Sequence, residues 1–444
     1  MTTTAYYRLS IAPELQLFEP EIAYACDFLD RAHAVQRVKQ ADRILHYGDR
    51  PPAGALAVPA AIFPSGVTLD TEGIYPAHDA LAGIEAGQGP NRLLPPAGVA
   101  VAGARLAYDA LGLIFHQISR IEERDSAYTD RYGRFSIEGA LATRQDSHLA
   151  PLADRAAHDL ASLIRGEEKP ANRTQYGVLL THDVDRLRGY HRPHLPLRYA
   201  AGDLVRRRDP QAAWKRIVVG YLSRLPWSSF NEIMDLSEHF GQQSRFYFMG
   251  PTWLSNDSPY VHTMPRLLRK LGDAVRRRGH IVGFHPGYAT ATDPAEWTRQ
   301  REGLEAALGC PVLEGRQHTL RYDSTVTPDI WVDAGMTMDC TLSYPETSSF
   351  RAGTCRPYHG YSLRHRRPRQ LIQHSTAIMD FSFFGGKYRD LTIEEALIEA
   401  AQAQAVCRDY GGTLTLLYHA GQPLAPERSF YRALLDQVLV KLVD

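Results

Sequence analysis

The chain has 444 residues, a length that suggests two domains at roughly 100–200 residues each. Lysine and arginine together number 50, as do aspartate and glutamate, so no net charge favours nucleic acid or an acidic membrane surface as a partner. The composition, 44% hydrophobic and 23% charged, is globular and excludes a fibrous or disordered chain.

The cysteines and the first residues of the chain bear on where the protein works. The five cysteines are scattered without zinc-finger or redox spacing, which favours a reducing compartment. Residues 1–7 lack the basic patch and apolar core of a secretion signal, and no apolar run is long enough to cross a bilayer. We therefore expect a cytoplasmic protein without a membrane span.

Residues 1–170 are predicted to form a mixed α/β accessory domain. Apolar residues at helical spacing indicate helices over residues 19–34, 108–124 and 151–164. The polar segment 165–172 is the expected linker to a second domain.

From residue 176 onward, strands alternate with helices, which is typical of stacked β/α units. Seven segments are predicted strands: 177–185, 245–249, 280–285, 312–314, 336–339, 371–374 and 413–419. Helices are predicted between them over residues 265–278, 294–308 and 393–410. This pattern predicts an α/β barrel of about seven units over residues 176–444, with its chemistry at the carboxyl ends of the strands.

Two aspartates end the first of these strands. Alternate side chains of a strand share a face, so Asp183 and Asp185 are expected to point the same way. Neighbouring carboxylates repel each other unless a cation or a shared proton relieves the repulsion. The pair therefore indicates either a metal or acid–base site, or a helix cap beside an aspartate that pairs with Arg186 or Arg188.

Histidines follow other predicted strands. His285 and His419 end two of them, and the strand at 312–314 leads to Arg316 and His318. One histidine at a strand end is more often structural than a ligand. Several strand ends that bring aspartate and histidine together suit a divalent ion such as zinc.

The order of these motifs resembles the polysaccharide deacetylase superfamily (NodB homology, carbohydrate esterase family 4-like). The motifs are Thr181-His182-Asp183-Val184-Asp185, Gly279-His280-Ile281-Val282-Gly283-Phe284-His285-Pro286, Gly315-Arg316 and Leu416-Leu417-Tyr418-His419. The resemblance covers residues 176–425 and implies a distorted barrel of about seven β/α units. It also implies metal-assisted hydrolysis of an acetamide.

A bacterial branch of this superfamily resembles the chain most. The segments that carry this likeness are Arg316-Gln317-His318, Phe350-Arg351-Ala352-Gly353-Thr354-Cys355 and Met379-Asp380, with Ser119-Arg120-Ile121-Glu122-Glu123 and Gly133-Arg134-Phe135 in the accessory region. We expect the accessory domain to close over the rim of the barrel.

The resemblance implies catalytic roles for three residues. Asp183 matches the general base, Arg316 the arginine that orients it, and His419 the general acid that protonates the leaving amine. The implied nucleophile is a metal-bound water whose pKa the metal lowers toward roughly 7.

The resemblance also implies metal ligands, with zinc as the expected ion. Asp185 matches the metal aspartate and His285 the first metal histidine. The position of the second metal histidine, four residues after His285, is occupied by Ala289. His318 is the candidate for the missing third ligand, whereas His280 is expected to point to the opposite face of its strand.

Three further residues complete the predicted site as substrate-binding residues. Arg351 could clamp a carboxylate or phosphate of the substrate, or pair with a structural acid. Tyr288 could stack on a sugar or cover the edge of the core. Asp380 could orient a site residue such as Arg316 or simply end a strand.

The sequence thus predicts a metal-dependent amide hydrolase acting on an N-acylated sugar or a related small metabolite. A non-hydrolytic carbohydrate-binding or scaffold protein with the same barrel is the alternative. A glycosidase that uses Asp183 with a partner acid is a third interpretation.

Overall fold

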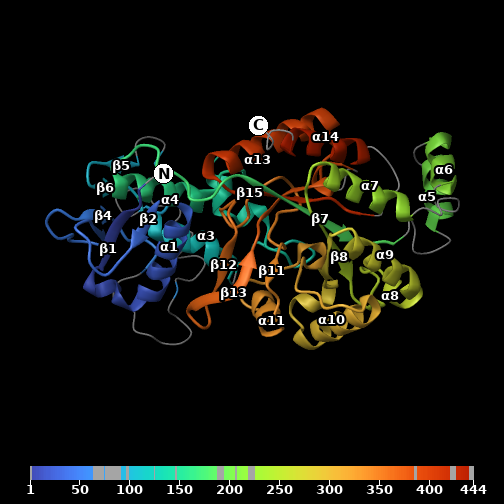
Figure 1. Cartoon of the computed structure of the whole chain (residues 1–444), viewed down its shortest axis with the longest axis horizontal. Helices are drawn as coiled ribbons and strands as arrows, with labels where there is room; N and C mark the ends of the chain where they lie inside the picture. Colours follow the sequence, from blue (N-terminus) through green and yellow to red (C-terminus); the bar gives the residue numbers. More distant parts are fainter. Residues whose placement is uncertain are drawn as a thin grey trace.

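Figure 1 shows the protein as a computed structural model of the whole chain. The residues that it describes are 3–63, 75, 92–96, 100–124, 126–145, 148–187, 195–205, 208–218, 226–384, 388–420 and 427–439. Among them, no helix combines the length and the apolar character needed to cross a membrane. Two separate sheets organise this part of the chain.

The first sheet has six strands and is built from residues 5–106. Across the sheet they are β2 (Val35–Arg37), β1 (Ala5–Ile11), β3 (Ile44–Tyr47), β4 (Leu56–Val58), β6 (Arg105–Leu106) and β5 (Val101–Ala102). All neighbours are parallel except β5 and β6. Three helices pack with this sheet in one hydrophobic core: α1 (Glu19–Ala32), α3 (Ala110–Ser119) and α4 (Leu152–Arg165).

The helix predicted over residues 108–124 is shorter than expected. Asp109 caps α3 by accepting a hydrogen bond from the Gly112 amide, and α3 ends at Ser119. Arg120 then adopts a left-handed conformation (φ 59°), so a single 3₁₀ turn follows it. Within this turn, Glu123 pairs with Arg351 from the region of the second sheet.

The second sheet has nine strands from residues 177–417. Across the sheet they are β12 (Tyr358–Ser362), β13 (Arg367–Gln373), β11 (Met338–Asp339), β10 (Glu314–Gly315), β9 (Ile281–His285), β8 (Ser244–Met249), β7 (Gly177–Val184), β15 (Thr413–Leu417) and β14 (Thr376–Met379). Only β12 is antiparallel to its neighbour. In the described chain β12 and β14 are the two edges, so the sheet is curled but open.

Helices flank the second sheet, with α13 and α14 along one side in Figure 1 and α10 and α11 along the other, whereas α5 and α6 stand apart from it. They are α5 (Leu195–Val205), α6 (Pro210–Ile217), α7 (Pro226–His239), α8 (Tyr260–Thr263), α9 (Pro265–Arg277), α10 (Pro294–Leu308), α11 (Thr327–Asp333), α12 (Asp380–Phe383), α13 (Ile393–Tyr410) and α14 (Glu427–Leu439). Local signals explain the predicted bounds of α13, since Thr392 and Glu395 form a capping box and Gly411 ends the helix at positive φ.

Each of the seven predicted strand segments overlaps a strand of the second sheet. Two strands of this sheet, β12 and β14, were not predicted. The four residues of β14 are too few to show a periodicity, and β12 contains Gly360. The predicted α/β class is therefore confirmed, whereas the seven-stranded barrel is replaced by a nine-stranded open sheet.

The parallel direction of the strands places their carboxyl ends at one edge of the second sheet. Two glycines let β9 and β10 approach closely there. A Cβ atom on Gly315 would lie 1.9 Å from the Phe284 carbonyl oxygen, and one on Gly283 would lie 2.6 Å from the Glu314 carbonyl oxygen. The close approach sets His285 and Arg316 side by side.

The N-terminal region packs against the β12–β13 edge of the second sheet. Its hydrophobic core also contains Tyr322, Leu342 and Tyr358 from that side. The two sheets are separate, but residues of both regions share this core. The division into domains 1–170 and 176–444 therefore stays a prediction.

Candidate metal and active site

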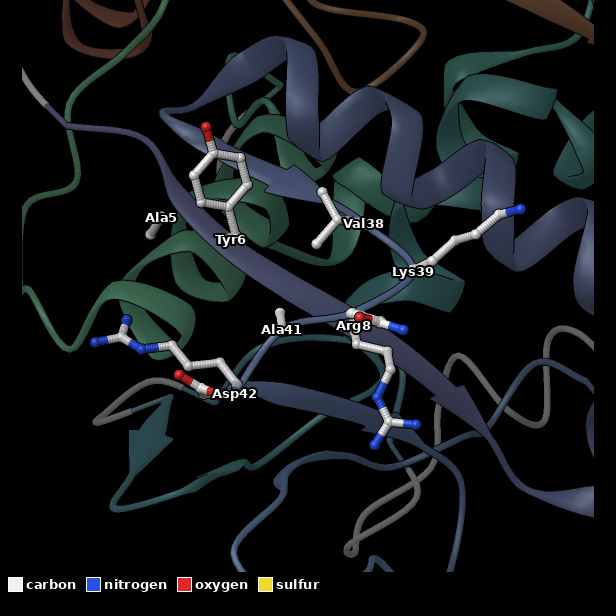
Figure 2. A pocket seen from close by; sticks show the side chains of 9 residues that line it. Ala5, Tyr6, Arg8, Val38, Lys39, Ala41 and Asp42 are labelled. Carbon is white, nitrogen blue, oxygen red and sulfur yellow. The ribbon is translucent and has the colours of Figure 1, made fainter.

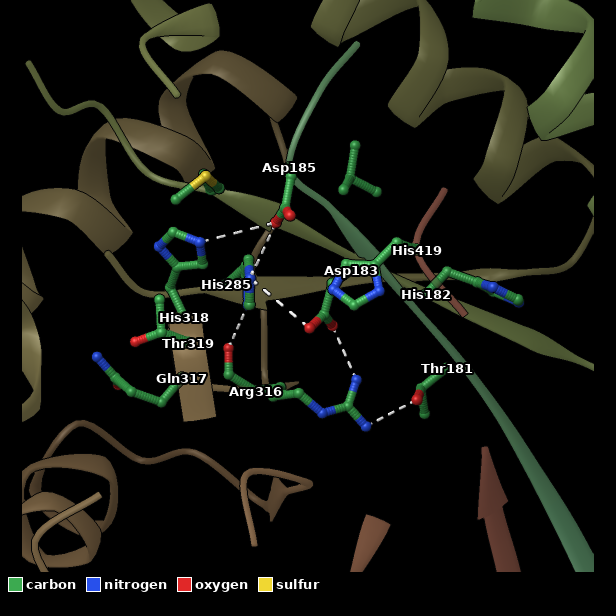
Figure 3. A network of polar contacts seen from close by, with 12 residues as sticks. Thr181, His182, Asp183, Asp185, His285, Arg316, Gln317, His318, Thr319 and His419 are labelled. Atoms are coloured by element: carbon green, nitrogen blue, oxygen red, sulfur yellow. Dashed lines mark hydrogen bonds and ion pairs between the residues drawn. The ribbon is translucent and has the colours of Figure 1, made fainter. Parts of the chain in front are cut away.

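Both aspartates at the end of β7 face His285, the last residue of β9 (Figure 3). Asp185 Oδ1 lies 3.4 Å from His285 Nε2, and Asp183 Oδ2 lies 3.7 Å from the same nitrogen. His182, which precedes Asp183 in β7, points to the other face, and its Nε2 lies 2.9 Å from Ser244 Oγ. The alternation of the strand thus separates two site residues from one structural residue.

Arg316 follows β10 and is completely buried beneath Asp183. Its Nη1 donates to Asp183 Oδ1 at 2.8 Å, and its Nη2 donates to the hydroxyls of Thr181 and Thr376 at 2.7 and 2.8 Å. Burial alone would raise the pKa of Asp183, but the charges of Arg316 and His285 outweigh it and hold that pKa below its usual range. Asp183 is therefore a fixed carboxylate with Oδ2 turned toward the site.

The hydrogen bonds of His285 determine which of its nitrogens faces Asp185. Nδ1 lies 2.6 Å from the carbonyl oxygen of Arg316, which can only accept, so Nδ1 carries the proton in the neutral ring. Nε2 is buried and has no hydrogen-bond partner, as does Asp185 Oδ1. Two unpartnered buried atoms that face each other are costly without a further group between them.

His318 reaches the same point from the loop after β10. Its Nε2 lies 3.9 Å from Asp185 Oδ1, and its Nδ1 lies 2.6 Å from Asp257 Oδ1. Asp257 is itself held by the Tyr288 amide at 3.0 Å. A carboxylate on Nδ1 orients a histidine so that Nε2 can bind a metal, which is a common arrangement around metal sites.

The three candidate ligand atoms fit a single small cation. One atom each from Asp185, His285 and His318 lies within 4.8 Å of the other two. Ligand atoms about 2.1 Å from one tetrahedral zinc ion lie about 3.4 Å from one another, so only a small closure is required. One carboxylate and two imidazoles are also a donor set that zinc accepts.

His419, just after β15, forms a second buried pair with Asp380. β14 and β15 pair in parallel through Met379 and Leu417, which sets the residues after them side by side. Asp380 Oδ1 lies 2.6 Å from His419 Nδ1, and Asp380 Oδ2 accepts from the His419 amide at 2.8 Å. Burial lowers the pKa of His419, but the charge of Asp380 and its hydrogen bond more than offset this and raise that pKa to about 9.

These side chains line a small cavity of about 110 Å³. Its apolar side consists of Leu320, Met379, Leu417 and Phe381. The ring of Phe381 stacks on His419 with centroids 3.9 Å apart. Tyr132 and Arg134 from the N-terminal region also line it.

The structure does not bring every predicted residue to this cavity. Arg351 is buried against Glu123 of the N-terminal region, with Nε–Oε1 and Nη2–Oε2 distances of 2.9 and 2.8 Å, so it forms the structural ion pair. Tyr288 donates its hydroxyl hydrogen to the Tyr132 carbonyl and does not line the cavity. Asp380 is near His419 rather than Arg316.

His280 and Ala289 lie outside the set of candidate ligands, as expected. His280 accepts from the Ser244 amide at 3.0 Å and takes no part in the cavity. Ala289 lies in the 3₁₀ turn Tyr288–Ala291 after β9 and has no ligand atom.

No role at the site was predicted for three residues near it: Asp257, Tyr132 and Arg134. No periodic pattern marks them, because all three lie in irregular segments. Arg134 belongs to the segment Gly133-Arg134-Phe135 that carries the family resemblance, but nothing in that segment identified the cavity that Arg134 lines.

A larger hollow of about 930 Å³ lies beside the first sheet, away from this site (Figure 2). Its lining consists of β1 side chains such as Tyr6 and Arg8 and of the segment 38–43, which is mostly exposed. This open surface carries no buried polar group among its described lining residues.

Residues 17–169 match the model of a family of unknown function, DUF7033. A comparison of the sequence with curated proteins finds no match.

Three solved structures are similar to part of this chain. A candidate polysaccharide deacetylase from Mycobacterium smegmatis is 19% identical, with a TM-score of 0.40, over 60% of this chain and 84% of the other. A probable polysaccharide deacetylase from Pseudomonas aeruginosa is 13% identical, with a TM-score of 0.39, over 60% and 85%. A mutant of a CE4 family pseudoenzyme with restored enzymatic activity is 13% identical, with a TM-score of 0.29, over 61% and 62%. These similarities assign no activity to the present chain.

Proposed function

We propose that this protein is a metal-dependent hydrolase that removes an acyl group, such as acetyl, from an N-acylated sugar or a related small metabolite. The observation that carries the proposal is the convergence of Asp185, His285 and His318, two of which present buried atoms without a partner. Zinc is the ion that we expect these three residues to hold.

A divalent ion held there would polarise the amide carbonyl of a substrate and acidify water. Asp183 would accept the proton of the attacking water through Oδ2, since Oδ1 is bound to Arg316. The charge of Arg316 keeps Asp183 ionised. Arg316 also prevents the rotation of the Asp183 carboxylate, because its own guanidinium is fixed by bonds to three further oxygens, one carbonyl and two hydroxyls.

His419 would donate a proton to the leaving amine. The raised pKa keeps its imidazole protonated at neutral pH, which is the state that a general acid requires. His318 and His419 lie on either side of His285 and Asp183 in Figure 3, and all four residues line the cavity in which a substrate amide would bind. The apolar side of the cavity around Leu417 offers room for a small acyl methyl group.

Metal content and product identity together test the proposal. We expect protein purified without chelator to carry about one divalent ion per chain, and at a free zinc concentration of 100 times Kd the apoprotein should gain about 2.7 kcal/mol of stability. Incubation with N-acetylated sugars should release acetate. Protein without stoichiometric metal and without a thermal shift on adding zinc would instead support the non-hydrolytic alternative, and release of free sugar would support a glycosidase.

The rate is expected to fall as pH rises through about 9, where His419 loses its proton. An Asp380→Asn variant removes the charge that raises this pKa, so its basic limb should move toward the ordinary histidine value of about 6.5. Profiles of kcat/KM against pH for the two proteins measure the shift. An unchanged basic limb in the variant would exclude His419 as the acid that Asp380 holds protonated.

A further inference from the structure

A tight hairpin of the N-terminal region, residues 129–135, reaches the catalytic cavity. Thr129 and Phe135 form an antiparallel bridge, and the Gly133 amide donates to the Asp130 carbonyl at 2.9 Å. Asp130 Oδ1 accepts from the amides of Tyr132 and Arg134 at 2.8 and 3.1 Å. These bonds define the hairpin through its backbone and one aspartate.

The hairpin is attached to the loops that carry the site residues. Arg134 Nη1 donates to the Thr319 carbonyl at 2.9 Å, next to His318. The Tyr288 hydroxyl donates to the Tyr132 carbonyl at 3.1 Å. Arg134 is buried, and its Nε is also bound to Asp130 at 2.7 Å. The hairpin is thus held in place on the site side by both polar contacts and burial.

Tyr132 and Arg134 form part of the cavity wall, and Arg134 Nη2 lies 3.3 Å from the hydroxyl of Tyr388, which also lines the cavity. The guanidinium carbons of Arg131 and Arg134 each lie 4.9 Å from the centre of the Tyr132 ring, which restrains the ring. The cavity volume of about 110 Å³ is well below the roughly 300–1,000 Å³ of pockets that enclose drug-sized ligands. A wall of this kind leaves room for a small group only.

We infer that the hairpin 129–135 limits the size of the group that reaches the catalytic centre, and so selects small N-acylated molecules or chain ends over interior units of a polymer. This inference rests on the proposed function. An interior unit needs space for the chain on both sides of its acylamino group, whereas the cavity that Tyr132 and Arg134 help to line has a volume of only about 110 Å³.

Two hydroxamic acids test the wall without requiring a known substrate, because a hydroxamate binds a divalent ion through two oxygens. Acetohydroxamic acid is small, and N-benzylacetohydroxamic acid carries bulk on the nitrogen, where a substrate carries its sugar. Both are titrated into cobalt-loaded protein and followed by the visible spectrum. The wild-type protein should bind the benzyl compound about tenfold more weakly than acetohydroxamic acid. Tyr132→Ala should bind the benzyl compound about tenfold more tightly than the wild type does, with an unchanged affinity for acetohydroxamic acid.

Two further variants sharpen the test. Tyr132→Trp should weaken binding of the benzyl compound further. Tyr128→Ala changes an exposed tyrosine just before the hairpin and outside the cavity lining, and it should match the wild type. Two results would overturn the size limit alone. One is cobalt-loaded wild-type protein that binds both compounds with equal affinity, and the other is a Tyr132→Ala variant whose affinity for the benzyl compound does not rise. Absence of bound cobalt in the wild type would contradict the proposed function and the size limit together.

Discussion

Replacement of His318 by alanine is expected to remove the divalent ion and, with it, the proposed hydrolysis. Asp185 and His285 would remain as the described protein ligands, whereas catalytic zinc sites normally use three. We expect metal content to fall from about one ion per chain to about a tenth or less. Elemental analysis of protein purified without chelator measures this, and circular dichroism checks that the variant is folded.

Two further variants serve as comparisons for His318→Ala. Asp257→Ala leaves His318 in place but removes the carboxylate that orients it, so metal affinity should fall by about 10–100-fold rather than vanish. His262→Ala changes an exposed histidine that stacks on Trp253, and it should retain full metal content. If His318→Ala retained the ion as firmly as His262→Ala, His318 would not be the third ligand.

Arg351→Ala is expected to destabilise the whole protein by about 3–5 kcal/mol, because it leaves one carboxylate in excess in a buried network of two arginines and two glutamates. Arg351 is bound to Glu123 through two nitrogens, and Arg120 lies 2.7 Å from both Glu122 and Glu123. All four side chains are at most 3% exposed. Chemical unfolding of the wild type and the variant measures the difference.

A double-mutant cycle separates the pair from its surroundings. Glu123→Ala should cost a similar amount, and the double variant should cost clearly less than the sum, because neither partner is then left unpaired. Arg367→Ala, at an exposed position of β13, should change stability by about 0.5 kcal/mol or less. Additive effects of the Glu123 and Arg351 changes would show that they act independently, and a change near zero for Arg351→Ala would show that the network does not hold the N-terminal region to the sheet.

Features that repeat along one element were predictable from the sequence. The apolar run of β7 and the alternation after it placed Asp183 and Asp185 on one face, and both contact His285. The cap signals of α13 gave its bounds. Such patterns are predictable because a strand or helix repeats the direction of its side chains at a fixed interval.

Features that join separate elements were not predictable in the same way. The partner of Arg351 is 228 residues away, and the sequence alone left a substrate carboxylate or phosphate and a structural acid equally open. Asp380 was expected to orient a site residue such as Arg316 or to end a strand. Its pairing with His419 was not predicted, because β14, which sets the two residues side by side, is too short to show a periodicity. The small residues of the β9–β10 contact were visible, but the distance between the strands was not.

The sequence by itself thus determined the α/β class, the strand ends that carry Asp183, Asp185, His285 and His419, and the absence of a histidine at Ala289. Only the tertiary structure decided that His318 and Asp257 meet beside Asp185, that Arg351 is used in an ion pair, and that a hairpin of the N-terminal region forms a cavity wall. The physical reason is that periodicity records which face of an element is buried, whereas the neighbour it is buried against depends on how distant segments pack.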